Sequence, residues 1–331
     1  MSAEPAAFSR TAVDAADHLV RSCGSLRAGE RVAIVVDERT LEIGRLVAER
    51  CAPLTAAVEM RQVPLAAMHG TEPPPAAAAA MKRADLIFGL THFSMAHTAA
   101  RRDACAGGAR YLSLPEYSLA LLEDPAVGVD YKARAPLVRA VADAFTAGDF
   151  VHVTSPRGTD VRLDVRGRTG NFCPGFVERP GELGSPPDIE ANVSPVETYS
   201  EGIVVVDGSI PCAEIGLLRE PVELDVRGGK IVAFRSRDDA VVATLERLFE
   251  RAGSEKAYVL AECGVGLNDA ARLTGIMLTD EGAAGTLHFG FGSNATVGGL
   301  NDVAFHLDFV FRDGAVAVDG TTVVDRGRVL A

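Results

Sequence analysis

Apolar residues recur with two different spacings along the first 150 residues of the chain. Residues 31–37 and 85–90 are short apolar runs of the kind that buried strands show, whereas residues 40–51 carry apolar side chains at helical spacing. Strands separated by helices at this rhythm predict a parallel sheet with helices on both faces. Neither a GxGxxG nor a GxxxxGK[ST] motif follows the first strand, so the sequence indicates a Rossmann-like domain without a nucleotide site. Further helices are expected at 13–23, after Pro73 and at 98–107, and further strands at 56–63 and 109–114.

From residue 149 onward, short β-type runs separated by glycine, proline and aspartate replace this pattern. One helix is expected at 238–252, and residues 308–318 are predicted to form a hairpin that turns at Asp313-Gly314. The sequence therefore predicts a Rossmann-like α/β domain over residues 1–148 and an α+β domain over residues 149–331. The runs that suggest strands are 150–154, 161–165, 202–207, 222–226 and 230–234.

Composition and charge narrow the class of protein. The chain has 331 residues, of which 47% are apolar, so it is long enough to bury a sizeable core. Its 33 basic and 45 acidic side chains give a net charge of −12, which argues against a nucleic-acid or anionic-membrane partner. The six scattered cysteines contain no CxxC pair, and no apolar stretch approaches the length of a signal or membrane-spanning segment. We expect a cytoplasmic protein that acts on a small molecule or short peptide.

The first candidate for chemistry is His306-Leu-Asp308, within the strand-like run 303–311. Alternate residues of a strand point to the same face, so these two side chains project together, about 7 Å apart along the strand. Such a pair can present an imidazole and a carboxylate to one metal ion. The alternative is a histidine hydrogen-bonded to a surface aspartate.

Two other segments strengthen the metal hypothesis. His288 lies in the glycine-rich run 285–292, where glycines let other groups come close. Glu262 ends the apolar run 258–266, and a buried carboxylate there is costly unless a cation pairs with it. The alternatives are a core histidine with ordinary hydrogen bonds and a surface glutamate at a strand end.

Together with Glu190, which stands five residues before Pro195, these segments resemble the aminopeptidase T (leucyl aminopeptidase) family of metallopeptidases, in its shorter-chain branch. The resemblance extends over nearly the whole chain. The motifs that carry it include Glu262-Cys-Gly-Val-Gly-Leu-Asn268, Gly285-Thr-Leu-His288, His306-Leu-Asp308 and, in the first half, Thr91-His-Phe-Ser-Met-Ala-His-Thr98.

The resemblance implies a homodimeric metalloenzyme whose second domain is catalytic. Its reaction would be hydrolysis of an N-terminal peptide bond or a small amide by a metal-activated water. Either Glu281 or Glu262 would pass a proton to the leaving amine. The implied ions are two of Zn²⁺, Co²⁺ or Mn²⁺, and the implied ligands are Glu190, Glu262, His288, His306 and Asp308.

His97 is the candidate of the first domain. It lies just beyond the C-terminal end of the predicted strand 85–90, where open α/β sheets place ligands. We expect it to contact substrate or relay a proton. The alternative is a structural hydrogen bond at the start of a helix.

The shorter relatives supply a second function. They resemble dioxygenases that cleave dihydroxypyridine rings with one Fe(II), held by the histidine-x-aspartate pair and a histidine near the Glu262 position, a role that His288 could take here. The peptidases carry a tyrosine where this chain has Ala295. A metal-dependent enzyme that forms or transfers an amide is a third possibility. A metal-free protein that binds a small molecule is the non-enzymatic alternative.

Overall fold

The structure is a computed structural model that describes residues 8–330, and two compact units make it up. One unit contains the described residues up to Tyr131 together with Gly175–Pro186, and the other contains Lys132–Pro174 and the residues from Pro187 onward. The longest helix, α6 (Tyr131–Ala147), therefore falls almost wholly in the second unit. The domain boundary predicted between residues 148 and 149 stays a prediction.

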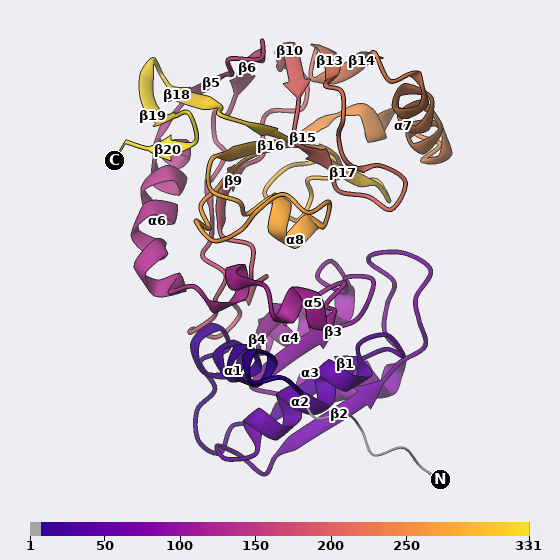
Figure 1. Cartoon of the computed structure of the whole chain (residues 1–331), viewed down its shortest axis with the longest axis vertical. Helices are drawn as coiled ribbons and strands as arrows, with labels where there is room; N and C mark the ends of the chain where they lie inside the picture. Colours follow the sequence, from indigo (N-terminus) through magenta and orange to yellow (C-terminus); the bar gives the residue numbers. More distant parts are fainter. Residues whose placement is uncertain (1–7, 331) are drawn as a thin grey trace. The chain divides into compact units, whose positions relative to one another are not determined.

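A five-stranded parallel sheet, sheet A, forms the centre of the first unit, as the sequence predicts (Figure 1). Its strand order is β2-β1-β3-β4-β8, so the chain moves first to one side of β1 and then to the other. The strands are β1 (Val32–Val36), β2 (Val58–Gln62), β3 (Leu86–Leu90), β4 (Arg110–Ser113) and β8 (Leu183–Gly184).

Helices cover both faces of sheet A, which confirms the predicted fold class. Val35 and Ile87 point to one face and share a buried cluster with Met81 of a helix. On the opposite face Gly44 packs so close to β1 that a Cβ there would lie 2.3 Å from Cγ1 of Val36. The helices are α1 (Arg10–His18), α2 (Leu41–Cys51), α3 (Pro75–Arg83), α4 (Ala99–Ala106) and α5 (Leu119–Leu122), with a π-helical turn at Leu19–Cys23 and a 3₁₀ turn at Pro125–Gly128.

Two largely antiparallel sheets build the second unit. Sheet B has the order β14-β13-β10-β6-β5-β18-β19-β20, and sheet C has the order β12-β11-β17-β16-β15-β9-β7. Sheet B contains β5 (Phe150–Thr154), β6 (Asp160–Asp164), β10 (Glu201–Val206), β13 (Val222–Arg227), β14 (Lys230–Ser236), β18 (Ala315–Val318), β19 (Thr321–Asp325) and β20 (Arg328–Val329). Sheet C contains β7 (Asn171–Cys173), β9 (Glu190–Val193), β11 (Ser209–Ile210), β12 (Gly216–Leu217), β15 (Leu260–Gly266), β16 (Thr286–Gly292) and β17 (His306–Arg312). The helical segments are α7 (Asp239–Arg251), α8 (Met277–Asp280) and a 3₁₀ turn at Glu255–Tyr258.

Aromatic side chains fill one face of sheet C. The rings of Phe289 and Phe311 stack with centroids 5.6 Å apart, and those of Phe291 and Phe309 meet edge to face at 5.4 Å. All four rings are fully buried. Because strand side chains alternate, this apolar face leaves the other face of β15, β16 and β17 free for polar residues.

The hairpin predicted over residues 308–318 is wrong. β17 pairs with β16 and β11 in sheet C, whereas β18 pairs with β5 and β19 in sheet B. Asp313 has a positive φ of 55°, and a Cβ on Gly314 would lie 2.2 Å from Cδ1 of Leu287. The tight turn is therefore real, but it carries the chain from one sheet to the other.

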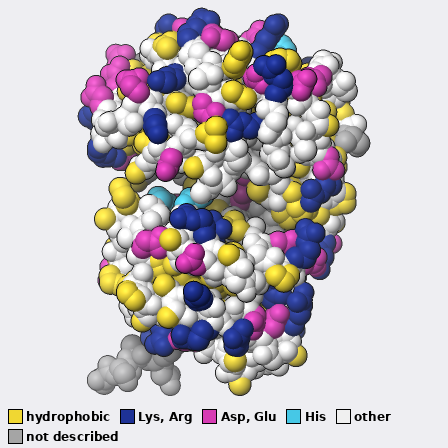
Figure 2. Space-filling view, turned by 180° about the vertical axis from the view of Figure 1, so that it is seen from behind, with side chains coloured by type: hydrophobic (Ala, Val, Ile, Leu, Met, Phe, Trp, Pro, Cys, Tyr) yellow, Lys and Arg dark blue, Asp and Glu magenta, His cyan; other side chains and the backbone are white. Residues whose placement is uncertain are grey.

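Charged side chains of both signs are mixed over the face shown in Figure 2. Surface ion pairs such as Arg31–Asp85 (2.7 Å) and Arg235–Glu223 (2.8 Å) hold opposite charges together. The acidic excess of the chain is therefore not gathered into a single field on this face. Among residues 8–330, the structure contains no helix that is long and apolar enough to span a bilayer.

Candidate metal centre

The predicted metal ligands gather on the polar face of sheet C. In the antiparallel register, Glu262 pairs with Gly290, which pairs in turn with Asp308, and His288 pairs with Gly264. Directly paired residues of neighbouring strands share a face. Glu190 pairs likewise with Gly266, and His306 pairs with Gly292. Four segments that are far apart in the sequence therefore present their side chains side by side.

The glycines of this face make room for the ligands. A Cβ on Gly264 would lie 2.1 Å from the ring of His288, and a Cβ on Gly290 would lie 2.6 Å from the ring of His306. Real Cβ atoms do not come this close to other heavy atoms. The glycine-rich pattern of β15 and β16 is thus required by the rings that lie across these positions.

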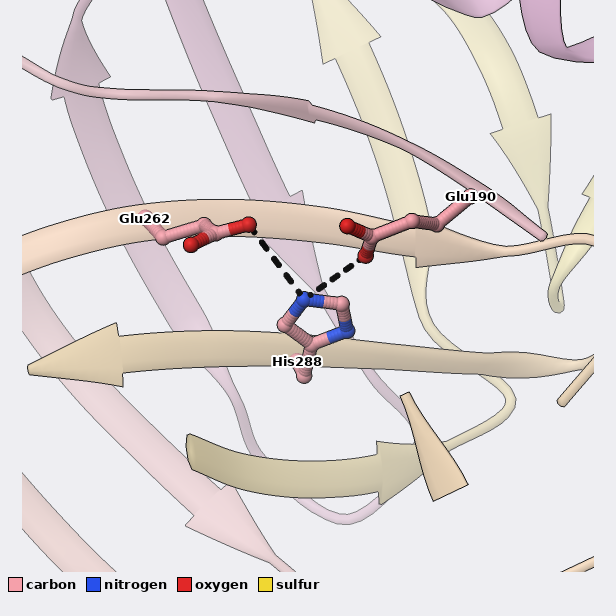
Figure 3. Close-up of side chains that lie close together, drawn as sticks. All are labelled: Glu190, Glu262 and His288. Atoms are coloured by element: carbon pink, nitrogen blue, oxygen red, sulfur yellow. Dashed lines mark ion pairs between the residues drawn. The ribbon is translucent and has the colours of Figure 1, made fainter. Parts of the chain in front are cut away.

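Glu190, Glu262 and His288 form the first ligand group. Nε2 of His288 lies 3.1 Å from Oε2 of Glu190 and 3.8 Å from Oε1 of Glu262, and all three residues are buried (Figure 3). One ligand atom from each lies within 4.8 Å of the others. Figure 3 shows both carboxylates directed toward the same edge of the imidazole, as ligands of a shared cation would be.

Glu262, His306 and Asp308 form the second ligand group, so that Glu262 belongs to both. Nε2 of His306 lies 3.6 Å from Oε2 of Glu262 and 3.2 Å from Oδ1 of Asp308. Nδ1 of His306 donates to the carbonyl oxygen of Ser293 at 2.8 Å, so in the neutral imidazole Nε2 is the nitrogen that carries the lone pair. The predicted alternation is confirmed here, since His306 and Asp308 do share a face.

Two further carboxyl groups border the ligands. Asp188 is buried two residues before Glu190, and Glu281 lies beside Asp308 at the end of α8. Burial, with added repulsion from neighbouring carboxylates, raises the pKa of Asp188 and of Glu281 well above their usual values, and burial also raises the pKa of Glu190. Oδ1 of Asp188, Oε1 of Glu281 and Oε2 of Glu190 have no hydrogen-bond partner.

This centre fits a bound divalent metal. Its donor set, His288 and His306 with the carboxylates Glu190, Glu262 and Asp308, suits Zn²⁺, Mn²⁺, Co²⁺ or Fe²⁺. Buried oxygens without partners are costly unless something positive or a proton donor reaches them. Neither ligand group formed by the described residues is a set of two histidines and one carboxylate.

The structure brings together most of the residues singled out from the sequence. The five predicted ligands form the centre, and Glu281 adjoins it. His97 belongs to the other unit, just before Thr98, whose hydroxyl caps α4. Its predicted role in catalysis stays a prediction.

Sequence reasoning missed Asp188, Asn192 and Cys173 as neighbours of the ligands. Cys173 pairs with Glu190 across β7 and β9, and burial and Glu190 keep the pKa of its thiol well above the usual range. Asp188 was open to discovery, because a residue two positions before a strand-borne ligand points to the same side. Asn192, two positions after Glu190 on the same strand, was open to discovery for the same reason. Cys173 depends on a strand pairing that no local pattern indicates.

The carboxyl edge of sheet A, in the first unit, is built differently. Oδ2 of Asp37 accepts from the backbone N–H of His92 at 2.5 Å, and its Oδ1 accepts from that of Arg39 at 2.9 Å. Glu72 accepts from the first backbone N–H groups of α4, those of Ala99 and Ala100. The chain's own carboxylates therefore fill the positions where an anion would bind, which agrees with the missing nucleotide motifs.

The fold is shared with solved structures of other proteins. The structure is similar to wild-type AmpT from Thermus thermophilus, with a TM-score of 0.71, 16% sequence identity and coverage of 98% of this chain and 100% of that chain. It is also similar to 2,5-dihydroxypyridine dioxygenase from Pseudomonas putida KT2440, with a TM-score of 0.84, 21% identity and coverage of 97% of both chains. At these identities the likenesses establish the fold alone.

The family model described as NicX, 2,5-dihydroxypyridine 5,6-dioxygenase, matches residues 17–331, and the chain belongs to this family of enzymes. The curated 2,5-dihydroxypyridine 5,6-dioxygenase of Pseudomonas putida KT2440 is 26% identical over 191 residues. That alignment covers 55% of this chain and 54% of the relative, so it spans about half of the relative's length.

The predicted aminopeptidase T-type hydrolase is wrong, because the family match is to a dioxygenase. The expected description of the protein as a metalloprotease, an aminopeptidase or a hydrolase is wrong for the same reason. The resemblance to aminopeptidase T is confirmed for the fold. The error arose because the histidine-x-aspartate pair is expected in both branches, so this pair does not distinguish the two reactions.

Proposed function

We propose that this protein is a metal-dependent dioxygenase that opens the ring of a hydroxylated N-heterocycle. The observation that carries the proposal is the buried centre around Glu262. The family to which the chain belongs is described as 2,5-dihydroxypyridine 5,6-dioxygenase. Opening of the ring by a dioxygenase places both atoms of O₂ in the product, so the reaction needs no external reductant. A small planar substrate also agrees with the net charge of −12, which argues against a nucleic-acid or anionic-membrane partner.

Glu190, Glu262, His288, His306 and Asp308 would hold the metal. When bound, a redox-active ion such as Fe(II) would supply the redox chemistry that lets O₂ add to the ring carbons of the hydroxylated substrate. Glu262 belongs to both ligand groups, so it would be available as a ligand to an ion bound in either group. Metal identity and number are part of the proposal.

The surrounding side chains would bind and orient the substrate and hold protons. Burial and the neighbouring carboxylates raise the pKa of Glu281 well above its usual value, which favours its protonated form. In that form it would donate a hydrogen bond to a substrate oxygen or return a proton to the opened ring. The Ser293 carbonyl keeps His306 in the orientation that metal binding needs. His97 is the proposed contribution of the first unit to substrate binding.

Oxygen consumption tests the proposal directly. Protein stripped of metal is reloaded under anaerobic conditions with Fe(II), Mn(II), Co(II) or Zn(II) and mixed with 2,5-dihydroxypyridine and O₂. We expect one O₂ consumed per ring, with loss of the aromatic absorbance, for a redox-active ion and not for Zn(II). The matched control is Asp37→Asn, which alters a buried carboxylate of the other unit and should retain the activity.

Absence of O₂ uptake with every metal, across a panel of mono- and dihydroxypyridines, would contradict the proposal. The panel also defines the substrate, because each ring differs only in the position or number of its hydroxyl groups. Preference for one pattern would indicate which ring oxygens the centre recognises.

A further inference from the structure

Behind Glu190 lies a buried amide that the proposed reaction does not use. Asn192 is 2% exposed, and its Nδ2 donates to Oε1 of Glu190 at 2.7 Å. The second hydrogen of this amide is directed at Sγ of Cys173, 3.9 Å away. Oε1 of Glu190 is thereby occupied, while Oε2 faces Nε2 of His288 at 3.1 Å and accepts no hydrogen bond. Asn192 thus decides which oxygen of Glu190 remains available to a cation.

The side-chain amide of Asn171 fixes the orientation of the Asn192 amide. Asn171 pairs with Asn192 across β7 and β9, and its Nδ2 donates to Oδ1 of Asn192 at 2.7 Å and to the carbonyl oxygen of Val297 at 2.9 Å. The two ends of this chain, a carbonyl and the Glu190 carboxylate, are acceptors only. Both amides must therefore turn their NH₂ groups toward those ends, so the direction of every hydrogen bond is determined.

The backbone of the loop 293–301 contacts His306 directly and is connected to Glu190 through Asn171 and Asn192. Its Val297 carbonyl ends the amide chain that reaches Glu190, and its Ser293 carbonyl accepts from His306. A half-buried ion pair outside the metal centre fixes this loop. Its contacts are Arg168 Nη2 with Glu197 Oε2 (2.6 Å), Arg168 Nη1 with the Gly298 carbonyl (2.7 Å), and Glu197 Oε1 with Asn294 Nδ2 (2.9 Å) and the Leu300 N–H (2.7 Å).

We propose that Asn192 and Asn171 are positioning residues, an amide relay that holds Glu190 as a one-oxygen metal ligand and is anchored on the loop 293–301. The inference rests on the metal centre proposed above and not on the identity of the substrate. Hydrogen bonds that orient a ligand raise metal affinity, and their removal typically weakens binding by about 10- to 100-fold. The relay also ties Glu190 to the loop that orients His306, so the two ligand groups share one support.

Titration of the metal-free full-length protein with Co(II) tests the relay without any substrate. In Asn192→Leu, which keeps the branched shape of the side chain with a somewhat larger volume but removes the donor, we expect affinity to fall by about 10- to 100-fold. We also expect the visible absorption of bound Co(II) to change, because Glu190 is free to rotate and to bind through either oxygen. A purely structural role of Asn192 would leave the spectrum of the bound ion unaltered.

A double variant separates positioning from stability. Asn192→Leu leaves an amide hydrogen of Asn171 without its acceptor. Asn171→Leu combined with Asn192→Leu removes that hydrogen but also the donor to the Val297 carbonyl. The relay predicts that Co(II) affinity stays low in the double variant whether its melting temperature rises or falls. Thr159→Val, which removes buried hydrogen bonds in sheet B, is the control that should lower stability and leave Co(II) affinity intact.

The outcomes are distinguishable. Wild-type affinity and spectrum in both Asn192 variants would overturn the relay while leaving the metal centre in place. Affinity that recovers together with stability in the double variant would also overturn it. Failure of the wild-type protein to bind Co(II) would instead contradict the metal centre on which the proposed function depends.

Discussion

Buried carboxylates occur in both units, but their hydrogen bonding is opposite. At the carboxyl edge of sheet A both oxygens of buried Asp37 accept backbone N–H groups, and the exposed Glu72 caps α4. On the polar face of sheet C, oxygens of Asp188, Glu190 and Glu281 accept no hydrogen bond. Burial without a partner is costly, so a protein keeps such groups where a ligand supplies the missing interaction. The comparison supports the proposal that the carboxylates of the second unit bind a ligand, whereas Asp37 and Glu72 in the first unit bind the backbone.

Removing the metal should give the largest effect and should act on the second unit. A ligand that binds only the folded state, present at about 1,000 times its Kd, stabilises that state by about 4 kcal/mol. We therefore expect a chelator to lower the melting temperature by several degrees and re-addition of metal to restore it. Hydrogen exchange should show the increased opening in β9, β15, β16 and β17. Equal opening in sheet A would break the contrast between the units.

Glu262→Gln tests the residue that both ligand groups share. The substitution keeps the shape of the side chain but removes its charge, so we expect metal affinity to fall by about 100-fold or more. Metal content per chain, measured by mass spectrometry after purification without chelator, checks this result. An unchanged metal content would show that Glu262 is not a ligand.

Asp37→Asn tests whether the buried carboxylate of the first unit has a structural role only. Hydrogen bonds to a charged group contribute about 1.5–3 kcal/mol, and this change weakens them in the first unit. We expect a loss of that order in the free energy of unfolding, measured in urea, with metal content unaltered. Loss of metal together with stability would mean that the carboxyl edge of sheet A is not merely structural.

Gly264→Ala tests the space that the glycines provide. The new Cβ would lie 2.1 Å from the His288 ring, so the ring or the strand must move. Overpacking of this kind costs about 1–3 kcal/mol, and we expect weaker metal binding as well. Gly128→Ala is the matched control, since a Cβ there would meet nothing within 4 Å. Normal metal binding in Gly264→Ala would show that His288 tolerates displacement.

The sequence by itself determined which side chains share a strand face. His306 and Asp308 lie together, and Cys263 points away from its neighbour Glu262 into the buried apolar face, because successive strand residues alternate whatever the surroundings. The helix and strand rhythm of the first unit was likewise sufficient to predict a parallel sheet. These properties follow from the geometry of the chain over a few residues.

Tertiary structure decided which strands are neighbours, and with it the functional contacts. The pairing of β9 with β7 placed Asn171 beside Asn192 and Cys173 beside Glu190, and the transfer of the chain after Asp313 to another sheet removed the predicted hairpin. The ligand residues alone also predicted the wrong reaction, since the histidine-x-aspartate pair was expected in both branches of the fold. Whether a buried oxygen is satisfied depends on groups from segments far apart in sequence, and only the folded chain brings those groups together.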